Sequence, residues 1–210
     1  MVAPPGGGKG SVAGLISKHH NIPHISSGDM FRENIKKCTE LGKKVEKYVT
    51  AGTLVPDGVV IESVMKRLEQ PDCRKGFILD GFPRTLNQAK VLGQKYDLDA
   101  VIEFKVSDEL VISRLCGRWM CKQCGCIWQE RYPDFKKEAC GKCSGEIYQR
   151  DDDKEDVIRH RLSLYRETFK DILDYYRTKG LIFTLEMTPE SMPEGNYAFV
   201  KQFFDAKGLK

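Results

Sequence analysis

Two patterns of apolar residues alternate along the chain, one typical of helices and one typical of strands. In the segment 9–20, Val12, Leu15 and Ile16 fall on one face of a helix. Short continuous apolar runs at 77–79, 100–106 and 181–185 are instead typical of buried strands. The same patterns predict a short extended piece at 23–25, and further helices over 29–37, 41–51, 56–69, 86–96, 108–116, 154–176 and 197–206. Strands that alternate with helices predict an α/β fold, with a parallel sheet covered by helices on both faces.

Ligands of such sheets bind beyond the carboxyl ends of the strands, and one strand here ends in a charged turn. The run 77–79 is followed by Asp80, by the turn Gly81-Phe82-Pro83, and by Arg84. A carboxylate at a strand end beside phosphates commonly binds hydrated Mg²⁺, and an arginine there can bind a phosphate through two nitrogens. Taken alone, the segment also fits an ordinary Gly-Pro turn after a strand.

The segment before the first helix is rich in glycine. Glycines let backbone N–H groups approach phosphates closely, Lys9 can reach the outer phosphates, and the hydroxyl of Ser11 can ligate Mg²⁺. The usual phosphate-loop pattern has Gly where Ala3 stands and a hydroxyl residue directly after the lysine, so the fit is imperfect. A flexible glycine-rich terminus is the alternative. The candidate phosphate-binding residues are Gly6, Gly7, Gly8, Lys9, Gly10 and Ser11.

Residues 118–153 interrupt the alternation and are interpreted as an insertion with paired cysteines. Cys121-x-x-Cys124 and Cys140-x-x-Cys143 are separated by 15 residues, which suits a tetrahedral zinc site with four thiolate ligands. Four protein ligands leave no open position, so the zinc is expected to be structural. Unpaired thiols in a loop are the alternative. Cys126 is a poorer ligand candidate because it lies just after the first pair.

Arginines gather around the insertion. Arg114 and Arg118 are four residues apart on one predicted helix face, Arg150 follows the cysteines, and Arg161 lies early in the next helix. Cations stabilise the charge that spreads over a phosphoryl group during transfer, so these arginines are candidate catalytic groups. A solvated charged face is the alternative for each of them. The histidines, at 19, 20, 24 and 160, are expected to be surface or cap residues.

Composition limits the class of protein only loosely. The chain has 210 residues, of which 40% are apolar and 30% charged, as in a globular domain with an insertion. The net charge of +4 is too mild to indicate a nucleic-acid partner, and no apolar run approaches the roughly 20 residues that span a bilayer. Paired cysteines without a visible secretory signal favour a reducing compartment, so the cytoplasm is expected, with an organelle matrix as the alternative.

These motifs together resemble the adenylate kinase family, in its long form with a zinc-bearing lid, over nearly the whole chain. The most specific match is Asp80-Gly81-Phe82-Pro83-Arg84 followed by Gln88. The resemblance implies a doubly wound P-loop kinase core at 1–26, 56–117 and 154–210, an AMP-binding helical segment at 27–55, and a zinc-binding lid at 118–153. It also implies a monomer that transfers a phosphoryl group reversibly from Mg-ATP to AMP, giving two ADP.

The resemblance further implies a role for each matching residue. Lys9, Arg84, Arg114, Arg150 and Arg161 would surround the transferring phosphoryl group, and Asp80 would order water on the magnesium. The donor would be contacted by Gly6, Gly7, Gly8, Lys9, Gly10, Ser11, Arg118, Ile127 and Trp128. AMP would be contacted by Ser27, Arg32, Thr53, Leu54, Val55, Gly81, Phe82, Pro83, Arg84, Gln88, Arg150 and Arg161, with Gln88 at the adenine edge. Asp152 and Asp153 would anchor the lid.

The chain departs from the family pattern at three places. Three residues precede Pro4 where the family has a full strand, Ala3 replaces the first glycine, and Glu186-Met187 replaces an Asp-Gly turn. The short first strand implies either a gap that weakens the sheet or a stub that the sheet tolerates. Two other functions stay open: a nucleotide-binding but catalytically impaired homologue, and a zinc-ribbon module that binds nucleic acid. A GTP-hydrolysing switch would need an Asn-Lys-x-Asp segment, which the sequence lacks, but the donor itself is either ATP or GTP.

Overall fold

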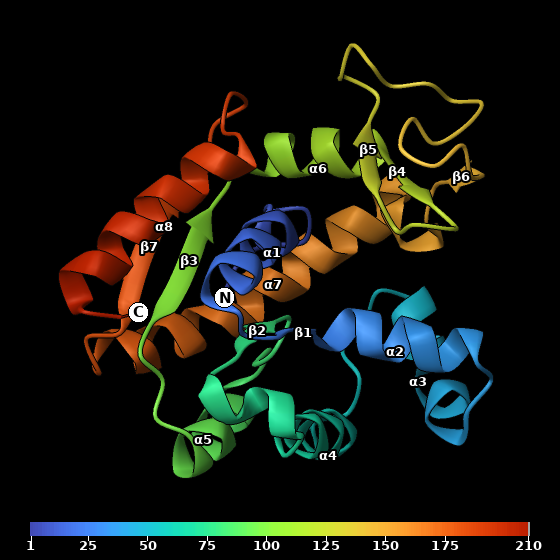
Figure 1. The fold of residues 1–210 in the computed structure, drawn as a ribbon. Coiled ribbons are helices and arrows are strands. Elements are labelled where there is room, and N and C mark those ends of the chain that lie inside the picture. The colour runs from blue at the N-terminus through green and yellow to red at the C-terminus, as the bar shows by residue number, and fades with distance from the viewer. Residues whose placement is uncertain (210) are drawn as a thin grey trace.

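The computed structural model describes residues 1–209, whose elements follow the predicted alternation of strands and helices (Figure 1). The helices are α1 (Lys9–His20), α2 (Ser27–Lys36), α3 (Glu40–Thr50), α4 (Asp57–Leu68), α5 (Leu86–Lys95), α6 (Asp108–Cys116), α7 (Glu155–Arg177) and α8 (Pro193–Lys207). The strands are β1 (His24–Ser26), β2 (Ile78–Asp80), β3 (Val101–Lys105), β4 (Arg118–Cys121), β5 (Ile127–Gln129), β6 (Ile147–Tyr148) and β7 (Ile182–Glu186). Two 3-10 helices are η1 (Pro71–Lys75) and η2 (Asp151–Asp153).

The last helix is the one whose start lies farthest from the position that the apolar pattern predicts. It begins at Pro193 rather than at 197. Proline is favoured in the first turn of a helix because it has no N–H to leave unpaired, and its first turn here carries polar residues that hide the start from an apolar pattern. Within residues 1–209, no helix has both the length and the apolar content needed to cross a membrane.

Two pairs of parallel strands form the central sheet. β1 pairs with β2, and β3 pairs with β7. Residues 1–3 connect the two pairs, because the amino group of Met1 donates to the Leu79 oxygen at 2.7 Å and the Val2 N–H donates to the Ile102 oxygen at 2.8 Å. The Val2 oxygen accepts from the Phe104 N–H, also at 2.8 Å. Of the two outcomes expected for this segment, the structure therefore has the stub, which bridges β2 and β3.

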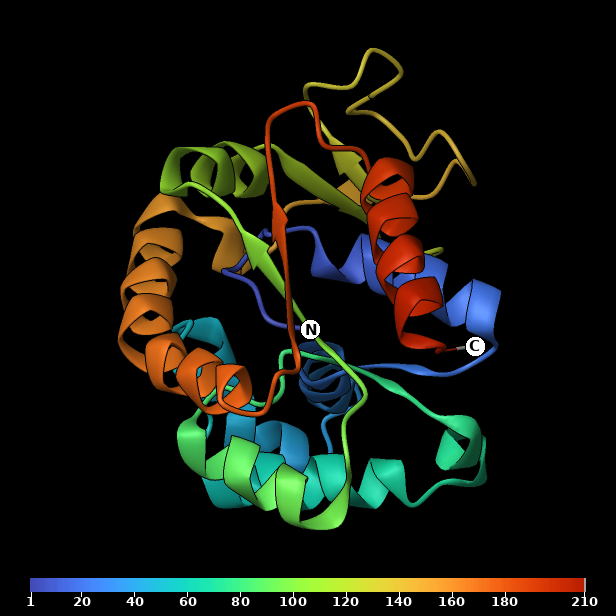
Figure 2. The same ribbon diagram turned by 90° about the vertical axis from the view of Figure 1, so that its left-hand side faces the viewer.

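Helices cover both faces of this sheet, as predicted. On one face, α1 and α8 contribute Ile16 and Val200 to a cluster with Phe104 of β3. On the other face, α5 and α7 contribute Ala89 and Ile172 to a cluster around Val2. Figure 2 shows β3 and β7 side by side, with α7 and α8 on opposite sides of them.

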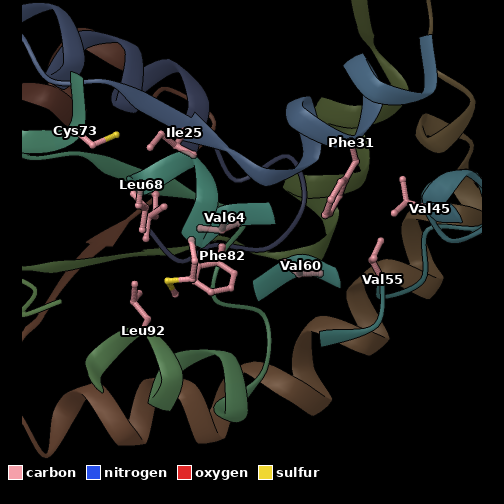
Figure 3. Packing of buried hydrophobic residues seen from close by; sticks show 12 residues of the cluster. Ile25, Phe31, Val45, Val55, Val60, Val64, Leu68, Cys73, Phe82 and Leu92 are labelled. Carbon is pink, nitrogen blue, oxygen red and sulfur yellow. The ribbon is translucent and has the colours of Figure 1, made fainter. Parts of the chain in front are cut away.

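A third apolar cluster joins α4 to the helix pair α2 and α3 (Figure 3). Phe31 of α2 and Val45 of α3 belong to it together with Val60 of α4. The two helices α2 and α3 pack very closely, because a Cβ atom at Gly42 would lie 2.2 Å from the main-chain oxygen of Asn34. No residue with a side chain fits at position 42 without moving one helix away from the other.

The insertion forms a small sheet of its own. β4 lies between β5 and β6 and is antiparallel to both. Its apolar cluster has three buried residues, Cys121, Cys140 and Ile147. So few buried side chains do not stabilise a fold by themselves, and a bound metal is a common substitute for the missing core.

Candidate active site

The phosphate-loop segment and the ends of β1 and β2 meet at one edge of the sheet, because their strands are parallel. In the loop, Gly6 and Gly8 have φ angles of 69° and 89°, which favour glycine. A Cβ atom at Gly7 would lie 2.7 Å from the Cβ atom of Ala3. The chain therefore turns tightly, with no side chain over residues 6–8, and the loop and the start of α1 line an open cleft. Such a loop suits a phosphate.

Lys9 folds back over this loop. Its Nζ donates to the main-chain oxygens of Ala3 and Pro4, both at 3.2 Å. Burial lowers the pKa of Lys9 to about 8, with nearby arginines adding to the shift and Asp80 opposing it. A phosphate beside Nζ would favour the charged form and reverse this shift.

Asp80 lies at the end of β2, where its Oδ2 is 3.3 Å from Nε2 of His24. Burial raises the pKa of Asp80, but the hydrogen bond to His24 and the charge of Lys9 outweigh burial and lower it to about 2. Asp80 is therefore ionised at neutral pH. Its Oδ2 lies 3.7 Å from where a Cβ atom of Gly10 would be, next to Ser11. Asp80 and Ser11 both line the cleft described below, and a carboxylate and a hydroxyl are oxygen ligands that suit a hard cation such as Mg²⁺.

A cleft of about 510 Å³ opens above the phosphate loop, bounded by α2, the insertion and α7. Its lining is strongly positive, which suits a polyanion. The charged residues that line it are Lys9, Asp29, Arg32, Asp80, Arg84, Arg114, Arg118, Arg131, Arg150 and Arg161.

Two aspartates of η2 bind three of these arginines. Arg150 donates to both carboxylate oxygens of Asp152, at 2.7 and 2.5 Å, and Arg161 donates to the same carboxylate at 2.9 Å. Arg118 donates to both carboxylate oxygens of Asp153, at 2.8 and 2.5 Å. The Asp153 side chain is 1% exposed. This second pair ties the first residue of the insertion to its last.

The cations of the cleft outnumber the carboxylates that could neutralise them. Burial lowers the pKa of Arg161 to about 10, and the charges of nearby arginines add to the shift against the pull of Asp152. Burial also lowers the pKa of Arg84, against the pull of Asp80. Cations that depress one another's pKa values are stabilised by an anion that binds between them.

A smaller pocket of about 60 Å³ adjoins the cleft on the side of α2. The hydroxyl of Ser27 donates to the Gly81 oxygen at 2.7 Å, and Nε of Arg84 donates to the same oxygen at 2.9 Å. These bonds position the guanidinium of Arg84 at the boundary between the two cavities. Of the residues predicted to contact AMP, this pocket is lined by Ser27, Arg32, Thr53, Leu54, Val55, Gly81, Arg84, Gln88 and Arg161.

The four paired cysteines of the insertion form one cluster. The Sγ atoms of Cys121, Cys124, Cys140 and Cys143 lie within 4.8 Å of one another. Two of the distances are 3.4 and 3.7 Å, and thiolates around a tetrahedral zinc ion stand about 3.8 Å apart. Trp128 donates from Nε1 to Sγ of Cys140 at 3.4 Å, as neighbours of metal ligands commonly do. The donor set and its spacing therefore fit a structural zinc ion.

Comparison with known proteins agrees with this geometry. The family model for adenylate kinase matches residues 1–181. A protein of Archaeoglobus fulgidus named adenylate kinase is 47% identical over 196 residues, which cover 90% of each chain. Proteins of the same name from Treponema denticola and Methanocella arvoryzae are 47% and 46% identical over 192 residues, covering 91% and 89% of this chain and 92% and 89% of theirs. The chain belongs to the adenylate kinase family.

Membership of the adenylate kinase family accounts for the P-loop fold and for the motifs around the cleft. It does not favour the zinc-ribbon nucleic-acid module, nor the catalytically impaired homologue, that the sequence left open.

The residues to which the adenylate kinase resemblance gives a role in binding or catalysis do not all line the cleft. Ile127 lines the cleft and is 51% exposed, whereas Trp128 packs against the cysteine cluster. Phe82 is 1% exposed and belongs to the apolar cluster under α4, while Pro83 lines the cleft. Arg114 lines the cleft too, but its Nη2 donates to the Thr188 oxygen at 3.0 Å and so connects α6 to the segment after β7.

The sequence analysis missed two residues of the site. The prediction that His24 is a surface or cap residue is wrong, because it lies half-buried in β1 against Asp80. Asp57 was predicted only as part of a helix start, yet its carboxylate accepts a hydrogen bond from Gln88 at 2.8 Å. Neither contact leaves a signal in sequence spacing, although Asp57 does stand two residues after Val55 of the predicted AMP set.

Proposed function

We propose that the protein catalyses the reversible transfer of the γ-phosphoryl group of Mg-ATP to AMP, giving two ADP. An oxygen of the AMP phosphate forms the new bond to the γ-phosphorus. The bond from that phosphorus to the oxygen bridging to the β-phosphate breaks, and its electron pair stays on the departing ADP. No proton needs to move, and no covalent intermediate on the protein is required.

One observation carries this proposal: Lys9, Arg84, Arg150 and Arg161 come from separate segments and line one cleft, with the pKa values of Lys9 and Arg161 lowered to about 8 and about 10. In-line transfer depends on positioning two polyanions and neutralising the charge between them. The phosphate loop would bind the ATP phosphates, and Arg84 with Arg32 would bind the AMP phosphate. Asp80 and Ser11 would hold Mg²⁺, which would supply charge neutralisation for the phosphates.

We further propose that residues 118–153 act as a lid. Water is the competing acceptor of the phosphoryl group, and a lid that closes only over both nucleotides suppresses hydrolysis. The pairs of Asp152 and Asp153 with the arginines would hold the base of this lid. Zinc on the four cysteines would keep it folded. Thiolates persist in a reducing compartment, so the protein is proposed to work in the cytoplasm, and as a monomer.

The purified protein tests the proposal in a coupled assay for ADP formation from Mg-ATP and AMP, with GTP in place of ATP as the comparison. The expected result is turnover that requires both nucleotides and prefers ATP as donor. Two adenosines joined by five phosphates should bind competitively with both nucleotides. Folded protein that neither turns over nor binds this bisubstrate mimic would contradict the proposal.

A further inference from the structure

Two polar residues from neighbouring helices form a hydrogen bond beside the smaller pocket. Gln88 lies in the first turn of α5, lines this pocket and is 1% exposed. Its Nε2 donates to Oδ1 of Asp57, the first residue of α4, at 2.8 Å. Its Oε1 accepts from the Arg84 N–H at 2.7 Å. The Gln88 carboxamide is thus bound at both ends.

These two bonds determine which way the carboxamide faces. If its oxygen and nitrogen exchanged places, the NH₂ group would meet the Arg84 N–H and the oxygen would meet a carboxylate. Both encounters are repulsive, since donor would face donor and acceptor would face acceptor. An amide orientation is assigned from its hydrogen-bond partners, and here both partners demand the same one.

Asp57 itself cannot adapt to a turned carboxamide. Its second oxygen, Oδ2, accepts from Oγ1 of Thr85 at 2.8 Å and from Nδ2 of Asn87 at 2.9 Å. Thr85 is also the N-cap of α5, where its side chain accepts from the Gln88 N–H. The carboxylate therefore receives three donors from the start of α5 and offers only acceptors in return.

The orientation leaves Gln88 one N–H and one oxygen lone pair that have no protein partner among residues 1–209. Adenine presents a matching pair on its Watson–Crick edge, an N6 donor and an N1 acceptor. The 6-oxopurines guanine and hypoxanthine present the reverse, an O6 acceptor and an N1–H donor. A freely turning glutamine could bind either kind of base, whereas a carboxamide in one orientation matches adenine.

We propose that Asp57 is the positioning residue that makes the acceptor site select adenine over 6-oxopurines. It acts through Gln88 and does not touch the base. This inference rests on the proposed function in taking a purine monophosphate as the acceptor, and on Gln88, which lines the smaller pocket, meeting its base. Discrimination of this kind is strong, because the wrong base leaves buried polar groups of the site unpaired.

Replacing Asp57 by Asn keeps the shape of the side chain but offers Gln88 a donor in place of an acceptor. The oxygen of the new side chain serves Thr85 and Asn87, so its NH₂ group faces Gln88. Donor then faces donor on this side, so only the Arg84 N–H still favours the original orientation and the turned carboxamide becomes populated. We therefore expect Asp57→Asn to lower kcat/KM for AMP by ten- to hundredfold. The value for inosine monophosphate should stay the same or rise, because its hypoxanthine differs from adenine at N1 and C6 alone.

The experiment measures kcat/KM and equilibrium binding for AMP and inosine monophosphate in the wild type, Asp57→Asn and Asp97→Asn. Asp97→Asn removes the same charge at an exposed position outside the pocket and should leave the AMP preference unchanged. A fall of at least tenfold in the AMP:inosine monophosphate ratio in Asp57→Asn supports the inference. An equal loss for both nucleotides, or a ratio within twofold of the wild type, overturns it and makes Asp57 purely structural.

Circular dichroism and thermal melting establish that the variant is folded. If Asp57→Asn does not fold, Asp57→Ser is used instead, because its hydroxyl donates as readily as it accepts and so removes the contribution of position 57 to the orientation of Gln88. Binding separates this inference from the proposed function. A wild type that prefers AMP in binding but does not turn over contradicts the kinase assignment alone. A wild type that binds both nucleotides equally overturns the role of Asp57, whatever the turnover.

Discussion

One nitrogen of Arg161 donates to both the main-chain oxygen and the carboxylate of Asp152, each at 2.9 Å. Since Arg150 binds the same carboxylate, one aspartate fixes the positions of two cations, one before η2 and one in α7. The aspartate balances only part of their charge, so the arginines stay available to a phosphoryl group while their positions are set in advance. Preorganised cations of this kind lower a barrier without reorganisation during the reaction.

Arg84 is expected to be the most sensitive of these arginines, because it stands where the smaller pocket meets the cleft. Arg84→Ala should lower kcat by on the order of 10³-fold, as removal of other cationic groups from phosphoryl transfer does. The measurement is the coupled assay, beside a melting curve that shows the variant is folded. Arg159→Ala is the matched control, because Arg159 is exposed and pairs with Glu155 on the outside of α7. A loss below tenfold in Arg84→Ala would remove Arg84 from the reaction.

The buried pair of Arg118 and Asp153 is expected to stabilise the attachment of the insertion. Asp153→Asn keeps the shape but leaves Arg118, whose side chain is 14% exposed, without its counter-charge. Breaking one side of a buried pair costs about 3 kcal/mol. Urea unfolding should show this loss in the free energy of unfolding. Asp151→Asn, an exposed neighbour in η2, should change it by less than about 0.5 kcal/mol. Equal effects of the two substitutions would mean that burial of the pair contributes nothing.

Binding of the donor should weaken at alkaline pH because of Lys9. The pKa of Lys9 in the free protein is lowered to about 8, so its charged fraction falls from about 0.9 at pH 7 to about 0.1 at pH 9. A phosphate binds the charged form, so affinity is close to full at pH 7 and falls as the pH rises through 8 and beyond. Calorimetry should find the Kd for Mg-ATP about tenfold higher at pH 9 than at pH 7. Lys9→Met should bind weakly with a flat profile, and an equally steep profile in that variant would assign the effect to another group.

Removal of zinc should unfold the insertion before it affects the rest of the chain. Structural zinc supplies on the order of 10 kcal/mol of folding free energy, far more than three buried residues supply. A strong chelator, or Cys140→Ser, should lower the melting temperature more than it lowers the activity of protein that is still folded. Metal analysis should find one zinc per chain. Cys38→Ser, at an exposed cysteine outside the cluster, is the control. Thermal stability that chelation leaves unchanged would exclude structural zinc.

Apolar spacing was enough to predict the layers of this fold, because each helix and strand buries one face against its neighbours. α1 was predicted with its observed bounds, and β2 was predicted to within one residue. Where polar residues start a helix, as at Pro193, the spacing of apolar residues does not indicate the start. The connection of the two strand pairs by Val2 was left open as well, because it depends on hydrogen bonds to β3 that lie far along the chain.

The candidate site was predicted in the parts that are local in sequence. The phosphate loop, the turn after β2 and the cysteine pairs are motifs whose chemistry depends on near neighbours. His24 and Asp57 gain their roles from partners 56 and 31 residues away, Asp80 and Gln88, so no local pattern marks them. Fold geometry alone brings such pairs together, and it also separates Trp128 from the cleft that its neighbour Ile127 lines.

The glycine at position 42 has a mechanical consequence. Because the main chains of α2 and α3 pack directly against each other there, a displacement of one helix displaces the other. Arg32 belongs to α2, and Thr53 follows the end of α3. Under the proposed function Arg32 and Thr53 both contact AMP, so a movement of this helix pair would shift the groups around its phosphate and its nucleoside together.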